Sequence, residues 1–366
     1  MSDPDNAPEC ASTIQKCLLI ALRHLDELDI RESGIGGQII TELMVGTTYQ
    51  YSGVMDSCLD CISAFYNSLP LELVLSEKSV DMLTRPLDTL CPLRLNPLFS
   101  HKIALDSCVG SILSIIGPGP FLTKLPIKIT GDPSQDGQVI ELNWIIPIFE
   151  TKMNRNISTG VFFRRLANMA DAMFTEAAKL DQFQSAVYFS LYREIWALFP
   201  KFCQNVTDQP TDFLKPAYAK GLNSILESSA DHHGEIKQYI LSGLRKLCMF
   251  SSQPENGEYK TVMKKFSPNY VKTLLNMYRA NDMSANVMSC AKEFVPLLDE
   301  PKAIEFYNVA KEKATDDPDE SLRPMYWDIV VLLAPWIPVD MIKVLFAEAH
   351  EMTKNNGATI QKKGLF

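Results

Sequence analysis

Amphipathic helical patterns follow one another along almost the whole chain. Over residues 187–199, apolar side chains gather on one side of a helix that turns by about 100° per residue, while Ser190 and Glu194 lie opposite. The apolar side comprises Val187, Tyr188, Leu191, Tyr192, Ile195, Leu198 and Phe199. A second such helix is predicted over residues 161–174. Neither helix can bury its apolar face alone, so each must cover its neighbour.

The same pattern recurs in both directions from this pair. Further helices are predicted over about residues 12–30, 37–49, 54–69, 72–90, 102–116, 218–228, 235–249, 261–280, 285–298, 302–313, 321–333 and 339–354. Short clusters with Pro, Gly or Asp separate them, so that helix pairs repeat about every 40 residues. The 366 residues also exceed the roughly 250–300 at which a single compact core stops growing.

These features predict an all-α fold, a HEAT/armadillo-like α-solenoid of stacked antiparallel helix pairs. We expect an N-terminal segment and first helix over residues 1–36 and the solenoid over residues 37–366. The array is expected to be incomplete at the C-terminus, because residues 360–366 look like the start of a further helix. A compact, irregular helical domain is the alternative fold.

One Pro/Gly-rich insertion interrupts the array near residues 117–143. It contains four prolines and a short alternating run over residues 125–129. An insertion loop with a short extended segment is predicted here. It either carries contacts on one face of the array or is a solvated connection.

Composition limits the class of protein. The formal net charge of -9 argues against a surface that binds nucleic acid all over, so any RNA contact must be a local patch. Nine scattered cysteines favour free, buried thiols in a reducing compartment. No apolar run reaches about 18 residues and the N-terminus does not resemble a signal peptide, so we expect a soluble, intracellular protein without a membrane contact.

No constellation of residues predicts an enzyme. Cys58 and Cys61 have the CxxC spacing of a redox pair or half a metal site, yet they lie within a predicted helix and no second pair follows. His232 and His233 are adjacent, so they do not face each other on a helix. We therefore predict no catalytic, cofactor-binding or metal-binding residue and no small-molecule substrate.

Two basic clusters are the candidate contact sites for RNA or a partner. The first cluster, which has no acidic residue and is interleaved with Phe266, Tyr270 and Tyr278, comprises Lys260, Lys264, Lys265, Lys272 and Arg279. The second comprises Lys152, Arg155, Arg164 and Arg165. Such clusters attract phosphates and nearby aromatic rings can stack on bases, although solvated helix faces over a core have the same composition. The acidic segment 299–320 should repel nucleic acid.

Ordered motifs from about Gln38 onward carry a family resemblance. They include the stretches at residues 90–97, 144–148, 160–168 and 195–203, which read LCPLRLNP, WIIPI, GVFFRRLAN and IWALFPKFC. In this order they resemble the central NUC173-type domain of the ribosomal RNA-processing protein 12 family, whose members are longer than this chain.

The resemblance implies a HEAT-repeat protein of the nucleus and nucleolus that shuttles to the cytoplasm. Its implied partners are the pre-ribosomal particle, rRNA and assembly or export proteins, and its implied role is a scaffold for maturation and export of the small subunit. It implies no catalytic residues. Two alternatives remain: a nuclear-transport or cytoplasmic adaptor solenoid that binds protein partners only, and a redox or metal enzyme that exposes Cys58 and Cys61.

Overall fold

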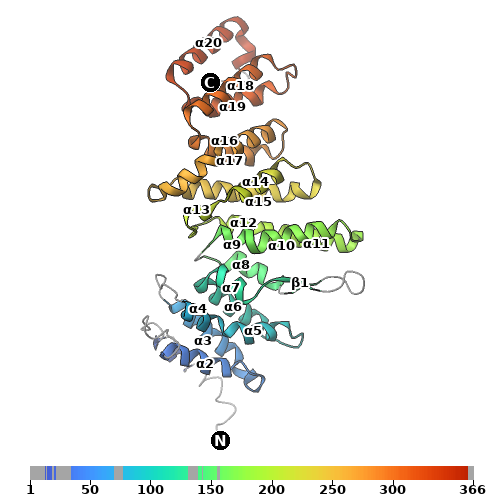
Figure 1. Cartoon of the computed structure of the whole chain (residues 1–366), viewed down its shortest axis with the longest axis vertical. Helices are drawn as coiled ribbons and strands as arrows, with labels where there is room; N and C mark the ends of the chain where they lie inside the picture. The colour runs from blue at the N-terminus through green and yellow to red at the C-terminus, as the bar shows by residue number, and fades with distance from the viewer. Residues whose placement is uncertain are drawn as a thin grey trace. The chain divides into compact units, whose positions relative to one another are not determined.

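The computed structural model describes residues 34–69, 77–130, 139–141, 143–154 and 157–361, together with a few residues between 13 and 21. They belong to two compact units, Met1–Phe213 and Leu214–Phe366 (Figure 1). Within each unit, helices pack against their neighbours in chain order, as a HEAT-like array requires. The predicted all-α solenoid fold is confirmed, with one small hairpin added. Most of residues 1–33 lie outside the description, so the division at residue 36 stays a prediction.

In the first unit, the elements described in full run from α2 to α13. Its elements are α2 (Ile35–Val45), η2 (Tyr49–Val54), α3 (Met55–Ser68), α4 (Glu77–Thr84), α5 (Pro86–Leu95), α6 (Lys102–Ile116), α7 (Pro118–Lys124), β1 (Lys128–Thr130), β2 (Val139–Glu141), η3 (Asn143–Ile145), α8 (Ile146–Lys152), α9 (Thr159–Val161), η4 (Phe162–Ala167), α10 (Asn168–Ala177), α11 (Gln182–Ala197), α12 (Phe199–Phe202) and α13 (Pro210–Phe213). The main pairs are α3 with α6, α6 with α8, and α10 with α11.

The second unit consists of longer helices. Its elements are α14 (Pro216–Glu227), α15 (Asp231–Ser251), η5 (Pro254–Asn256), α16 (Gly257–Arg279), α17 (Ser284–Phe294), η6 (Val295–Leu297), α18 (Glu300–Asp316), α19 (Arg323–Leu333), η7 (Ala334–Trp336) and α20 (Val339–Gln361). Helix α16 packs on α14, α15 and α17, and α18 pairs with α19.

Local chemistry fixes where several helices begin. The Asp181 carboxylate accepts hydrogen bonds from the backbone N–H groups of Phe183 and Gln184, which caps α11. Pro86 lies at the start of α5 and divides the single helix predicted over residues 72–90 into α4 and α5, because proline is favoured in the first turn of a helix. Residues 70–76 of that predicted helix lie outside the description.

The Pro/Gly-rich insertion is more regular than a loop. Its first part is helix α7, which has Pro118 in its first turn, so the expectation of a loop directly after Gly117 was wrong. The predicted extended segment is present as strand β1, which pairs antiparallel with β2 through Ile129 opposite Ile140. Residues 131–138, which join the two strands, lie outside the description.

The helix predicted over residues 161–174 contains a wider turn. Residues 162–167 form the π-helical segment η4 between α9 and α10, in which Phe162, Phe163, Leu166 and Ala167 are all buried. A π-helix bonds each N–H one residue further back than an α-helix does, and such segments are uncommon. The turn presents two neighbouring pairs of apolar side chains to the same core while Arg164 and Arg165 remain exposed.

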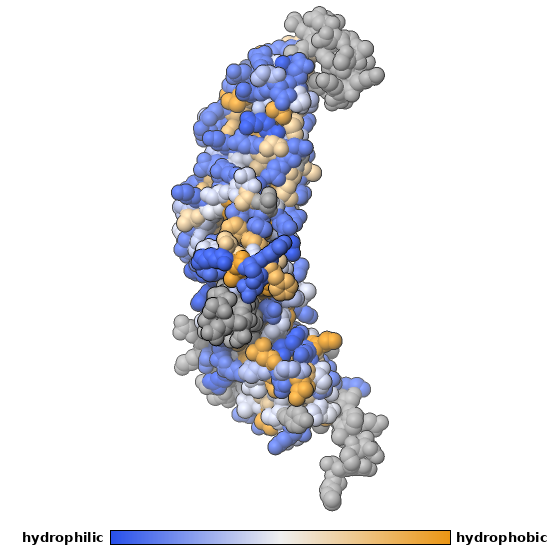
Figure 2. Space-filling model, turned by 90° about the vertical axis from the view of Figure 1, so that its right-hand side faces the viewer, coloured by the Kyte–Doolittle hydropathy of each residue, from blue (hydrophilic) through white to orange (hydrophobic). Residues whose placement is uncertain are grey.

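The surface combines hydrophilic side chains with exposed apolar ones such as Leu98, Ile103 and Phe183. No helix in the described part of the chain is both long and apolar enough to cross a membrane. On the face drawn in Figure 2, hydrophobic residues form small groups between hydrophilic ones. The surface is therefore suited to contacts that combine charge with small apolar patches.

Candidate functional site

The CxxC pair lies on the helix α3 and lacks the properties of a reactive pair. Cys61 is buried, and burial raises the pKa of its thiol to about 11. Burial also raises the pKa of Cys58. Reactive and metal-binding cysteines need the opposite, a lowered thiol pKa with access to solvent or an ion. Among the described residues, no group of three or more His, Cys, Asp or Glu side chains could hold a metal ion.

A labelling experiment checks this reading of the thiols. In folded protein near neutral pH, Cys61 should react with iodoacetamide at least about 100-fold more slowly than an ordinary thiol, because a pKa two units higher lowers the thiolate fraction that much. The exposed Cys17 is the internal reference, and urea-unfolded protein should label at every cysteine. Peptide mass spectrometry gives the rate at each site. A Cys61 that reacts as quickly as Cys17 would restore the redox hypothesis.

The first basic cluster lies along α16. Lys264, Lys265, Lys272 and Arg279 are exposed, while Lys260 is half-buried. The opposite side of the helix is buried in the core through residues such as Met263, Leu274 and Met277. In the described part of the chain, neither Lys264 nor Lys265 has an ion-pair partner within 4.0 Å. These two ammonium groups are therefore available to an external anion.

The aromatic residues interleaved with this cluster are buried or half-buried. Tyr270 is buried, and its hydroxyl donates a hydrogen bond to the Ala219 carbonyl at 3.1 Å. The Tyr278 hydroxyl donates a hydrogen bond to the Asp328 carboxylate at 2.6 Å. Burial, and to a lesser degree this contact with Asp328, raises the pKa of Tyr278 to about 12. Phe266 is half-buried. Tyr270 is thus not available to stack on a base, and the basic residues are the part of this cluster that faces solvent.

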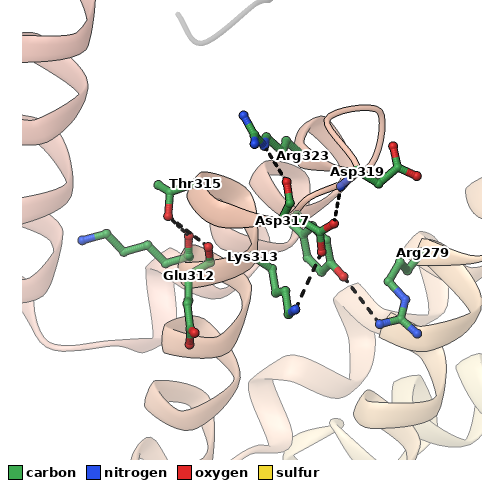
Figure 3. Close-up of polar contacts among 9 residues, drawn as sticks. Arg279, Glu312, Lys313, Thr315, Asp317, Asp319 and Arg323 are labelled. Atoms are coloured by element: carbon green, nitrogen blue, oxygen red, sulfur yellow. Dashed lines mark hydrogen bonds and ion pairs between the residues drawn. The ribbon is translucent and has the colours of Figure 1, made fainter.

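Two of the α16 residues line a groove shared with α18 and α19. Lys272 and Arg279 lie along one side, and the groove has a volume of about 440 Å³. Two lysines of α18, Lys302 and Lys313, face them from the other side. The Arg279 guanidinium points toward Tyr326 and donates a long hydrogen bond of 3.5 Å to its hydroxyl (Figure 3). Lys302 and Lys313 were not predicted to belong to this cluster, because they are distant from it in the sequence.

The acidic segment is partly neutralised where it turns. Asp317 is buried, accepts a hydrogen bond from the Asp319 N–H, and lies 3.8 Å from the Lys313 ammonium (Figure 3). The Arg323 guanidinium donates to the Asp317 carbonyl and to Glu320. Hydrogen bonds from Ser321 hold the pKa of Asp319 below its usual range. The loop therefore repels anions less than its sequence suggests.

The second basic cluster is divided between elements of the first unit. Lys152 ends α8, and its aliphatic stem crosses Gly110 of α6 so closely that an added Cβ there would lie 2.6 Å from Lys152 Cγ. Arg164 lies over Gly160, where a Cβ would be 2.9 Å from Arg164 Nη1 and 3.3 Å from the Asp208 carboxylate.

Arg164, like its neighbour in the sequence, is exposed to solvent. Arg165 is exposed on η4. Arg155 lies outside the described residues. The first cluster is the stronger candidate for binding an anion, because its basic residues lie along one helix, and the second contributes Lys152, Arg164 and Arg165.

Known proteins match most of the chain. The family model for the HEAT repeats of ribosomal RNA-processing protein 12 matches residues 9–298. The RRP12-like protein of Homo sapiens is 24% identical over 330 residues, covering 87% of this chain and 24% of the human protein. The RRP12-like protein of Gallus gallus is 22% identical over 332 residues, covering 87% of this chain and 24% of its own length.

A fungal protein is also similar to this chain. Ribosomal RNA-processing protein 12 of Saccharomyces cerevisiae is 18% identical over 294 residues, which cover 71% of this chain and 23% of the yeast protein. The chain spans about a quarter of the length of the curated relatives it matches. The ordered motifs, the stacked helix pairs and the family model over residues 9–298 lead to one assignment. This chain belongs to the ribosomal RNA-processing protein 12 family, in the region of its HEAT repeats.

Proposed function

We propose that the chain is a non-catalytic scaffold in ribosome biogenesis, which associates with pre-small-subunit particles and supports pre-rRNA processing and nuclear export. Membership of the family supports the setting, because the relatives are named for ribosomal RNA processing. The fold supports the mechanism, since stacked helix pairs offer an extended surface to several ligands at once. The proposed location is the nucleus and nucleolus, with shuttling to the cytoplasm.

One observation carries the RNA part of this proposal. Lys264 and Lys265 lie exposed on the 23-residue helix α16 with no ion-pair partner within the described part of a protein whose formal net charge is -9. A local cationic surface on an acidic protein can bind phosphates without attracting nucleic acid elsewhere. Lys260, Lys152, Arg164 and Arg165 are proposed as weaker contributors, and rRNA together with assembly or export proteins is the proposed set of partners.

Charge reversal tests the RNA contact. Purified Lys264→Glu/Lys265→Glu protein should bind single-stranded precursor rRNA roughly tenfold more weakly per lost phosphate contact at 0.1 M salt, because counterion release is lost with each contact. The slope of log affinity against log salt should fall by about one per contact. Fluorescence anisotropy over a salt series measures both quantities.

The matched control is Lys220→Glu/Lys343→Glu, which makes the same change of charge at exposed lysines of the same unit. This control should bind RNA nearly as the wild type does. Equal losses in the two double variants would mean that only overall charge matters, and the α16 contact would be wrong.

Crosslinking in cells tests the biological role. Tagged wild-type protein should crosslink to small-subunit precursor rRNA and sediment with pre-ribosomal particles, and the α16 double variant should lose much of the crosslinking. Protein that stays in light gradient fractions without enriched rRNA would contradict the scaffold proposal. The adaptor that binds protein partners only would then be the better account.

A further inference from the structure

The groove between α16, α18 and α19 combines an apolar floor with a cationic rim. Its floor is aliphatic and includes Leu275, Val309, Ala310 and Ile329. Val309 lies in the middle of α18, and yet 55% of its surface remains exposed. An exposed apolar side chain at the centre of a helix that is otherwise packed leaves area that a partner can cover.

The rim of the groove has a strong positive balance. Four cationic side chains line the groove, Lys272, Arg279, Lys302 and Lys313, against the single carboxylate of Glu305. Glu305 is already paired, because the Lys302 ammonium donates to it at 2.6 Å. The ion pair of Lys313 with Asp317 is long, at 3.8 Å, and Arg279 makes only a 3.5 Å bond to a neutral hydroxyl. Three of the four cations can therefore turn toward an external carboxylate at little cost.

The shape and chemistry favour a peptide over a nucleic acid. A groove that stacks bases needs exposed aromatic faces, whereas this floor is aliphatic, its Tyr326 is buried and its Phe306 is half-buried. Aliphatic anchors between two helices, surrounded by charge of one sign, are typical of sites that take an amphipathic helix of the opposite charge.

We propose that this groove binds an acidic amphipathic peptide segment of a partner protein. One or two of its leucine or phenylalanine side chains would insert beside Val309 and Leu275, and its carboxylates would face Lys272, Arg279 and Lys313. The site extends the proposed scaffold role to a protein partner. It is separate from the proposed RNA contact, because neither Lys264 nor Lys265 lines the groove.

The test uses the whole chain and three synthetic helical peptides. One carries leucines at positions i, i+4 and i+7 with glutamates elsewhere, the second replaces the leucines by serine, and the third replaces the glutamates by lysine. We expect only the first peptide to bind well. Val309→Asp and Lys272→Glu/Lys313→Glu should each weaken its binding by roughly tenfold. The first variant removes the apolar contact for the peptide leucines, and the second removes the positive charge that faces the peptide carboxylates.

Separate variants distinguish this proposal from the RNA contact. Lys264→Glu/Lys265→Glu should keep the affinity for the first peptide, and Val309→Asp should keep the affinity for single-stranded RNA. Circular dichroism checks that Val309→Asp is folded, which we expect because the side chain is exposed. The proposal is overturned if the groove variants bind the first peptide as the wild type does, or if the serine peptide binds equally well. Loss of RNA binding in Val309→Asp would show that the groove is a nucleic-acid site. If the wild type self-associates in sedimentation and Val309→Asp does not, the groove would instead be an interface between two copies.

Discussion

Replacing Phe162 by alanine should lower the free energy of unfolding of the first unit by roughly 3–5 kcal/mol. Phe162 is fully buried in the π-helical segment η4. Its ring lies 5.5 Å from the Trp196 ring, 5.1 Å from that of Phe199 and 5.3 Å from that of Phe202, so it joins η4 to α11 and α12. Truncation would remove these contacts and leave a cavity that three large rings cannot easily close.

Hydrogen exchange is the suitable measurement, because stacked helices need not unfold in one step. Amides of α10, α11 and α12 should lose protection in Phe162→Ala, and urea denaturation should begin at lower concentration. The matched control is Phe183→Ala on α11. Phe183 is 81% exposed, so the free energy of unfolding should change by less than about 0.5 kcal/mol. Similar losses in the two variants would contradict the role assigned to the buried ring cluster.

Replacing Asp282 by alanine should destabilise the second unit by roughly 3–5 kcal/mol. The Asp282 carboxylate accepts a 2.6 Å charge-assisted hydrogen bond from Lys237, whose side chain is only 8% exposed. Without its partner, the ammonium group stays buried and uncompensated. Asp282 also lies between Asn281 and Met283, which both adopt left-handed backbone conformations. The ion pair therefore also holds a strained turn between α16 and α17.

The two partners should not be equivalent. Lys237→Met should cost less than Asp282→Ala, because the Asp282 side chain is 33% exposed and water can solvate it after the lysine is removed. The double variant should recover much of the loss, since no buried charge is left. A double-mutant cycle, followed by hydrogen exchange of α15, α16 and α17, gives these differences. Equal costs for the two single variants would show that burial of the lysine is not the cause.

The helical fold could be predicted because apolar residues recur with the period of a helix along almost the whole chain. Which residues of a helix are buried was harder to predict from the sequence. Val187 was expected on the buried side of α11 and is 44% exposed, while Trp196, outside the predicted apolar set, is buried. The buried arc centres on Tyr188, Tyr192 and Ile195, and so it is narrower than the apolar arc of the sequence. Packing against α10 decides which part of that arc is covered.

The groove could be predicted only in part. Lys272 and Arg279 belong to a run without acidic residues, which the sequence displays directly. Lys302 and Lys313 alternate with Glu305 and Glu312 along α18, so that they look like the solvated face of an ordinary helix. Their proximity to α16 depends on how helices of neighbouring pairs pack, which follows from loop geometry and side-chain volumes rather than from local periodicity.

The wider turn at η4 has a consequence for how this protein can change during evolution. A π-helical turn is longer by one residue than the α-helical turn it replaces. Loss of either Arg164 or Arg165 would let the turn tighten while Phe162 before it and Met173 after it keep their places in the core. We therefore expect that deletion of one of these two residues would leave the helices that follow in place. The segment is a point at which the length of the chain can vary and the register of the array is preserved.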